Sequence, residues 1–73
     1  MEKLRELAER EQEARELRRR EADWRYIDSL PPRIKAAVKL FIETGDLRLS
    51  QRISGLGLED FVEHLRRANV WIT

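Results

Sequence analysis

The spacing of apolar residues predicts a helix in the middle of the chain. Apolar side chains recur at the helical spacings i, i+3, i+4, i+7 and i+8, which defines one face of a helix over Pro32–Glu43. The residues of this face are Ile34, Ala37, Val38, Phe41 and Ile42. Proline is tolerated in a first turn, because the N–H it lacks has no helical partner, and Gly45 suits the C-terminal end.

Two shorter helices are predicted next. Asp46 can cap a helix over Leu47–Ser54, and we expect Leu49 and Ile53 to point inward from it. A tight turn at residues 55–57 (GLG) separates it from a last helix over Leu58–Ala68. The apolar positions of the last helix are Leu58, Phe61, Val62 and Leu65. Since Phe41 and Phe61 stand at the centres of the two best apolar faces, we expect each to be buried against the other's helix.

The N-terminal region predicts a long helix of another kind. Glu2–Asp23 has no glycine or proline, and it pairs acids with bases at i,i+4 spacing. An approximate coiled-coil seam is formed by Leu4, Leu7, Ala14 and Leu17, with Glu11 and Glu21 falling on it. Three interpretations stay open: a solvated helix held by its own ion pairs, a short coiled coil with a second copy or a partner, and phosphate binding by residues 18–20 (RRR).

Two aromatic, β-prone segments flank the last three helices, namely Trp24–Ile27 and Val70–Thr73. In one interpretation Trp24 extends the long helix and Trp71 folds back onto the core. In the other, both segments pack on a partner, because exposed tryptophans are frequent interface hot spots. The candidate partner-binding residues are Leu4, Leu7, Leu17, Trp24, Tyr26, Trp71 and Ile72.

Together these elements predict an all-α protein. Residues 1–28 form an extended charged helix and possible coiled coil, and residues 29–73 form a compact tri-helical module that resembles a helix-turn-helix and ends in a β-prone tail. A chain of 73 residues is marginally stable alone. It has no cysteine for disulfides, so we expect self-association or docking on a partner protein.

Charge and hydropathy narrow the class of partner. The chain carries 15 Lys and Arg against 14 Asp and Glu, without the basic excess of dedicated nucleic-acid modules. No apolar run is long enough for a membrane span, and residues 1–20 are too charged for a signal peptide. We therefore expect a cytoplasmic protein with no membrane partner. The abundance of Arg and Glu is common in thermophile proteins.

No catalytic, cofactor or metal site is predicted. His64 is the single histidine, cannot hold zinc alone, and is expected at the surface or boundary of its helix. The Gly55-x-Gly57 turn lacks the third glycine, the lysine and the preceding strand of a phosphate loop. We therefore expect no enzyme, no cofactor and no small-molecule substrate.

Residues 46–68 are typical of a helix-turn-helix, which raises the possibility of DNA binding. A recognition helix presents its first turn to the bases, and here that region carries Glu59, Asp60 and Glu63, which repel phosphate. The candidate nucleic-acid contacts are Arg48, Gln51, Arg52, Arg66 and Arg67. DNA binding is therefore the second expectation, after protein binding.

Residues 40–49 (LFIETGDLRL), 53–56 (ISGL) and 59–65 (EDFVEHL) resemble the small prokaryotic antitoxins of the VapB-like helix-turn-helix type. Such proteins have a helix ending in glycine, a short helix rich in small residues, a Gly-Leu or Gly-Met turn and an xxxFxxxL helix. The resemblance implies a partner of the PIN-domain ribonuclease class and, often, binding to the operator. We therefore expect an antitoxin-like, protein-binding regulator. The alternatives are a DNA-binding transcriptional regulator and a structural subunit of a larger assembly such as a ribonucleoprotein.

Overall fold

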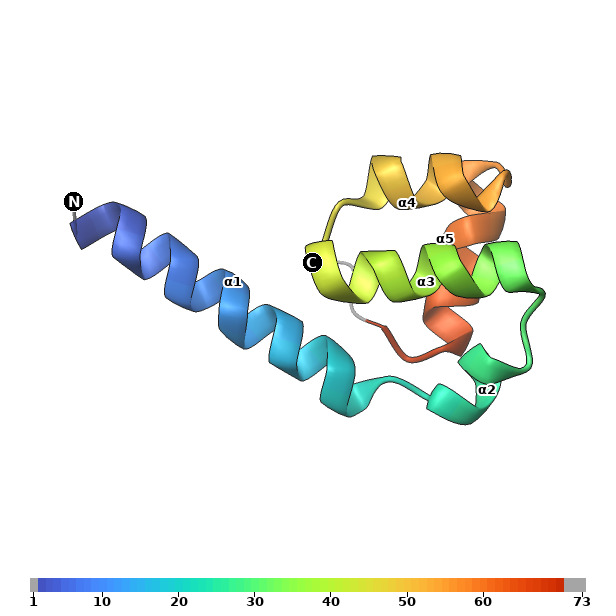
Figure 1. Ribbon diagram of the computed structural model, residues 1–73, viewed down its shortest axis with the longest axis horizontal. Helices are drawn as coiled ribbons and strands as arrows, with labels where there is room; N and C mark the ends of the chain where they lie inside the picture. The colour runs from blue at the N-terminus through green and yellow to red at the C-terminus, as the bar shows by residue number, and fades with distance from the viewer. Residues whose placement is uncertain (1, 71–73) are drawn as a thin grey trace.

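The chain folds into helices joined by short connections (Figure 1). The computed structural model describes residues 2–70, with side chains from residue 10 onward, and contains no strand in that range. The helices are α1 (Glu2–Glu21), α2 (Trp24–Asp28), α3 (Pro32–Thr44), α4 (Leu47–Ser54) and α5 (Leu58–Arg67). The all-α prediction is confirmed. None of the described helices is long and apolar enough to cross a membrane.

The helices of the module begin and end close to where the sequence predicts. α3 runs one residue past its predicted end, α4 has its predicted bounds, and α5 ends one residue early. Gly45 and Gly55 close α3 and α4 with left-handed φ angles of 71° and 75°. Glycine adopts this conformation without the steric cost that a Cβ imposes, so the two turn positions are well matched to their sequence.

Trp24–Ile27 forms the start of a short helix, so the prediction of a β-prone segment there is wrong. The long helix ends at Glu21, and Trp24 therefore does not extend it. Asp23 caps α2, because its carboxylate accepts a hydrogen bond from the backbone N–H of Tyr26 at 3.1 Å. This local cap outweighs the weak β propensity of the aromatic residues that follow.

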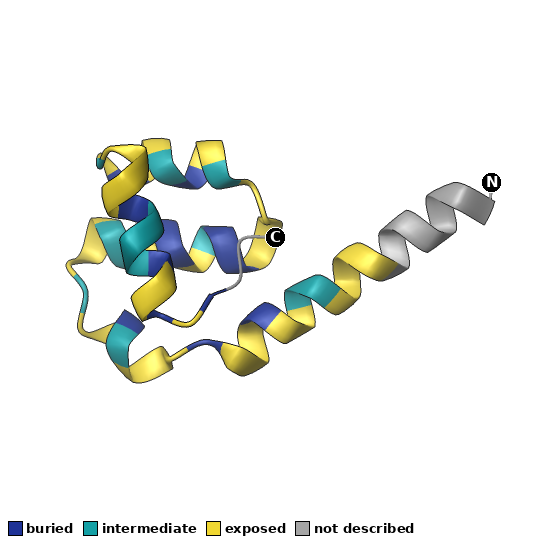
Figure 2. Ribbon diagram, turned by 180° about the vertical axis from the view of Figure 1, so that it is seen from behind, coloured by how far each residue is buried: buried dark blue, intermediate teal, exposed yellow. Residues whose placement is uncertain are grey.

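One core lies between α2, α3 and α5 (Figure 2). Phe41 and Phe61 are 1% and 0% exposed, which confirms that both are buried. The other buried members are Ala22, Ile27, Ala37, Val38, Ile42, Leu65, Ala68 and Val70. Ala22 and Ile27 belong to this core although they precede residue 29, so the chain on both sides of that position builds it.

α4 lies antiparallel beside α3 and turns its small residues inward (Figures 1 and 2). Ser50 and Ser54 are 0% and 4% exposed, whereas Leu49 and Ile53 are 41% and 39% exposed. The prediction that Leu49 and Ile53 point inward is therefore wrong. Small side chains let two helices approach closely, and serines at i and i+4 provide such a contact strip.

The two buried serines differ in their hydrogen bonds. Ser50 Oγ has no partner among the residues that the structure describes. Ser54 Oγ donates to the Gln51 carbonyl and accepts from the Leu56 N–H at 3.1 Å.

We expect Ser50→Ala to raise the free energy of unfolding by about 1 kcal/mol, because it removes an unsatisfied buried hydroxyl and adds helix propensity. Ser54→Ala, the matched control, should lower it by about 1 kcal/mol, because Leu56 loses its acceptor. Urea unfolding measures both. Equal destabilisation by the two variants would show that Ser50 has a partner in solution.

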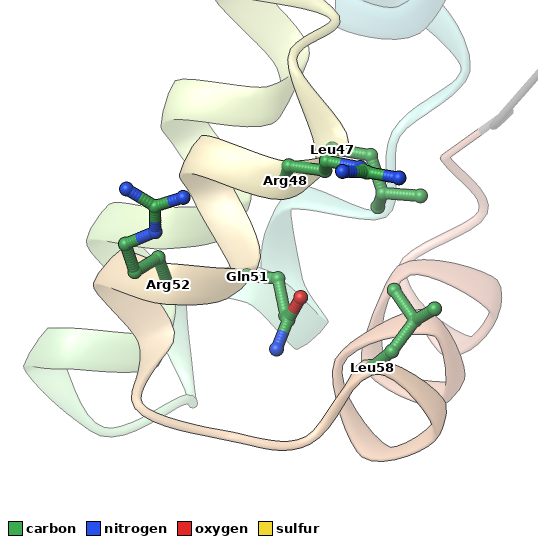
Figure 3. A pocket seen from close by; sticks show the side chains of 5 residues that line it. All are labelled: Leu47, Arg48, Gln51, Arg52 and Leu58. Carbon is green, nitrogen blue, oxygen red and sulfur yellow. The ribbon is translucent and has the colours of Figure 1, made fainter.

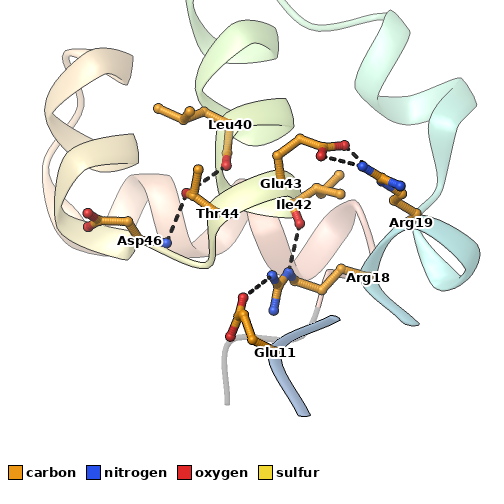
Figure 4. Close-up of polar contacts among 8 residues, drawn as sticks. All are labelled: Glu11, Arg18, Arg19, Leu40, Ile42, Glu43, Thr44 and Asp46. Carbon is orange, nitrogen blue, oxygen red and sulfur yellow. Dashed lines mark hydrogen bonds and ion pairs between the residues drawn. The ribbon is translucent and has the colours of Figure 1, made fainter. Parts of the chain in front are cut away.

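Two adjacent arginines attach α1 to the C-terminal end of α3 (Figure 4). Arg18 is buried: its Nε donates to the Ile42 carbonyl at 2.9 Å, and its Nη2 donates to Glu11 at 3.1 Å. Arg19 makes two hydrogen bonds to Glu43, one of them Nε–Oε1 at 2.8 Å, and these hold the pKa of that exposed carboxylate below its ordinary value. Two arginines of the 18–20 run are thus engaged within the chain, and α1 projects from the module toward its N-terminus (Figure 1).

The C-terminal end of α5 is fastened to the junction of α1 and α2. Asn69 adopts a left-handed φ of 58°, and its amide donates to the Glu21 carbonyl at 2.8 Å. The Val70 N–H reaches back to the Leu65 carbonyl at 2.9 Å, and the Asn69 N–H to the Arg66 carbonyl at 3.0 Å. This bond pair is a Schellman motif, which satisfies the last carbonyls of a helix.

Candidate partner-binding surface

The outward side of α4 combines apolar and cationic side chains. Leu49 and Ile53 lie one turn apart on it, and Arg48 and Arg52 lie one turn apart beside them; all four are exposed. We call these four residues the α4 face. They are outward because the helix is held by Ser50 and Ser54 on its other side.

A groove of about 550 Å³ runs along one edge of the α4 face and opens to solvent. It is lined by Leu47, Arg48, Gln51, Arg52 and Leu58 (Figure 3). Leu58, 49% exposed, extends from α5 toward the first turn of α4. Gln51 donates to the Leu56 carbonyl at 3.1 Å and so holds the turn between α4 and α5 in place.

The arginines of α4 differ from those of α5 in their electrostatic surroundings. Among the described side chains, neither Arg48 nor Arg52 forms an ion pair. Arg66 and Arg67 both contact Glu63, at 3.9 Å and 3.2 Å. The hydrogen bond to Glu63 raises the pKa of Arg67. The arginines of α4 therefore keep a positive charge that no described acid offsets, whereas those of α5 share one glutamate.

The shape of the face favours a broad ligand over a small anion. The Arg48 guanidinium extends toward α5 and that of Arg52 extends away from it (Figure 3). Two diverging guanidinium groups do not converge on one phosphate-sized ligand. Glu59 and Asp60, both exposed, follow Leu58 in the first turn of α5 and oppose a polyanion at the groove.

The structure separates the nucleic-acid candidates into two groups. Arg48, Gln51 and Arg52 lie together at the groove, whereas Arg66 and Arg67 occupy the last turn of α5, at the opposite end from Leu58. The sequence pattern did not identify Leu49 and Ile53 as surface residues. The signal available in the sequence was the i,i+4 pair of serines, since small residues at that spacing suit a close helix contact.

The partner-binding candidates do not form one surface in the described residues. Leu17 and Trp24 are exposed, at 49% and 39%, and the Trp24 indole N–H donates to the Arg19 carbonyl at 2.9 Å. Tyr26 is half-buried, and its hydroxyl hydrogen-bonds His64 Nδ1 at 2.9 Å. The side chains of Leu4 and Leu7, and the residues Trp71 and Ile72, lie outside the part that the structure describes.

His64 lies at the boundary of α5 and is half-buried, as the sequence predicts. Within the described residues, no cluster of His, Asp or Glu is arranged to hold a metal ion. Comparison of the chain with models of known families, with curated proteins and with solved structures found no match.

Proposed function

We propose that the protein is a non-enzymatic, antitoxin-like regulator that binds a partner protein through the α4 face. The observation that carries this proposal is the exposure of Leu49 and Ile53 directly beside two arginines that have no ion-pair partner among the described side chains. Interfaces between proteins are typically built from apolar side chains with arginine among them. Such a face fits a partner surface that is apolar at its centre and acidic around it.

The resemblance to VapB-like antitoxins supports a more specific partner. A ribonuclease of the PIN-domain class has an acidic active site, and arginines that lie across such a site would neutralise it. Arg48 and Arg52 have the charge and exposure that this role needs. In this proposal the regulator inhibits the nuclease by covering its carboxylates.

DNA is the second candidate, because Arg48, Gln51 and Arg52 lie side by side at an open groove. Two features weigh against it. The exposed apolar side chains of Leu49 and Ile53 gain nothing from contact with phosphate, and Glu59 and Asp60 repel it.

The test is binding to a purified ribonuclease of the PIN-domain class, measured by calorimetry. We expect the double variant R48E/R52E to bind about 100-fold more weakly, since charge reversal turns attraction into repulsion at the interface. The matched control is R66E/R67E, which makes the same charge change on α5. It should alter affinity by less than about threefold, because those arginines lie away from the face.

DNA binding is measured separately, by the fluorescence anisotropy of an operator duplex of about 30 base pairs. Tight, sequence-selective DNA binding by the wild type, with no affinity for the nuclease, would replace the proposal by the DNA-binding alternative. Equal loss of nuclease affinity in the two double variants would show that net charge matters and the α4 face does not.

A further inference from the structure

Two ion pairs engage charged side chains of α1: Glu11 pairs with Arg18, and Arg19 pairs with Glu43. Five exposed charged side chains of α1 have no ion-pair partner among the described side chains. They are Arg10, Glu13, Glu16, Arg20 and Glu21.

Two of these charges lie on a regular seam of α1. Arg10, Ala14, Leu17 and Glu21 follow the alternating spacing 4, 3, 4 of coiled-coil core positions, and none of the four is buried. This seam does not include Glu11, which the structure places toward Arg18 and the module. Leu17 at its centre is 49% exposed, which is costly for a leucine.

The seam is complementary to itself when two copies run antiparallel. In that arrangement the a positions of one helix face the d positions of the other. Ala14 then lies opposite Leu17 of the second copy, and Arg10 lies opposite Glu21, each contact occurring twice by the two-fold symmetry. At the edge of the seam, Glu13 faces Arg20 of the second copy.

A parallel arrangement has the opposite electrostatics. It places Arg10 opposite Arg10 of the second copy, and Glu21 opposite Glu21 of the second copy. Like charges that directly oppose each other are destabilising. The order of charges along the seam therefore selects both the partner and the direction. We infer that α1 binds α1 of a second copy of this chain, antiparallel, along the seam Arg10–Ala14–Leu17–Glu21.

This homodimer uses a different surface from the proposed α4 face, so the two hypotheses fail separately. It also accounts for a helix whose N-terminal part projects from the module: an isolated helix is marginal in water and gains stability when a second helix packs on it.

Sedimentation equilibrium of the full chain tests the inference through a charge exchange. We expect wild type to dimerise at concentrations of about 10–100 µM. R10E and E21R should each weaken dimerisation by about tenfold or more, because each places two like-charged pairs on the seam. The double variant R10E/E21R should return the dimerisation constant to within about threefold of wild type, since it exchanges the charges and restores both pairs.

Glu16→Arg is the matched control: it makes the same charge change as E21R on an exposed position of α1 that is off the seam. Its dimerisation should equal that of wild type. A wild-type chain that is monomeric at about 500 µM would overturn the inference, as would a double variant no better than R10E.

Direction is tested by cysteine crosslinking, which is simple because the chain has no cysteine. A mixture of A14C and L17C chains should form a mixed disulfide under mild oxidation, and A14C alone should form little. Efficient crosslinking of A14C to itself would show a parallel pair and overturn the antiparallel arrangement. Circular dichroism confirms that each exposed-site variant keeps its helices.

Discussion

Phe61→Ala is expected to remove much of the protein's stability and to lower its melting temperature sharply. The side chain is 0% exposed in the core that α5 shares with α2 and α3. Truncating a buried phenylalanine costs about 3–5 kcal/mol, because it removes apolar contact and leaves a cavity. A domain this small has a total stability of roughly 4–11 kcal/mol at 0.05–0.15 kcal/mol per residue, so the loss takes much of it.

Thermal and urea unfolding, followed by circular dichroism at one fixed low concentration, measure this effect. The concentration is fixed because self-association would add stability of its own. Leu58→Ala is the control on the same helix, and since that side chain is 49% exposed, its unfolding midpoint should fall only slightly. A Phe61→Ala protein that melts at the wild-type temperature would show that α5 does not pack through this face.

The features that the sequence predicts well are those with local causes. Pro32 at the start of α3, Asp46 at the cap of α4 and the glycines at positions 45 and 55 act within a few residues, and the helix bounds follow them closely. The buried phenylalanines follow from a long apolar periodicity, which is the strongest pattern in the chain.

The orientation of α4 could not be predicted, because an eight-residue helix shows too little periodicity. Leu47, Ser50 and Ser54 define one face of it, and Leu49 with Ile53 defines another. Apolar content favours the second face, but the close contact with α3 admits only the small residues of the first. The composition of the α4 face depends on which side of α4 packs on α3. The sequence therefore predicted the arginines of this face but not its apolar residues.

The attachment of α1 to α3 could not be predicted from the sequence for a different reason. Arg18 stands in a run of charges that looks uniformly solvated, and nothing within the helix distinguishes it from Arg20. Its partners are the Ile42 carbonyl, 24 positions away, and the ring of Phe41, 5.8 Å from the guanidinium carbon. Only the tertiary contact shows that one arginine of the run is structural.

Arg18→Ala should therefore be far more destabilising than its neighbour Arg19→Ala. Arg18 is 7% exposed and donates to a carbonyl in the last turn of α3, where the helix dipole favours a positive charge. A buried, charged hydrogen bond contributes about 1.5–3 kcal/mol, and contact with the Phe41 ring adds to it, so we expect a loss of about 2–3 kcal/mol. Arg19 pairs with Glu43 at the surface, where water and salt screen the attraction, so its loss should change stability little.

Arg18→Met separates the two parts of this effect, since it keeps apolar contact with Phe41 and loses the hydrogen bond to Ile42. Its stability in urea should lie between wild type and Arg18→Ala. Hydrogen exchange gives the sharper measurement: amides of α1 should lose protection in Arg18→Ala, because the projecting helix is released from α3. Amides of α3 and α5 should keep most of theirs, because their core is intact. Equal destabilisation by Arg18→Ala and Arg19→Ala would contradict this account, because it would mean that the buried guanidinium contributes no more than an exposed one.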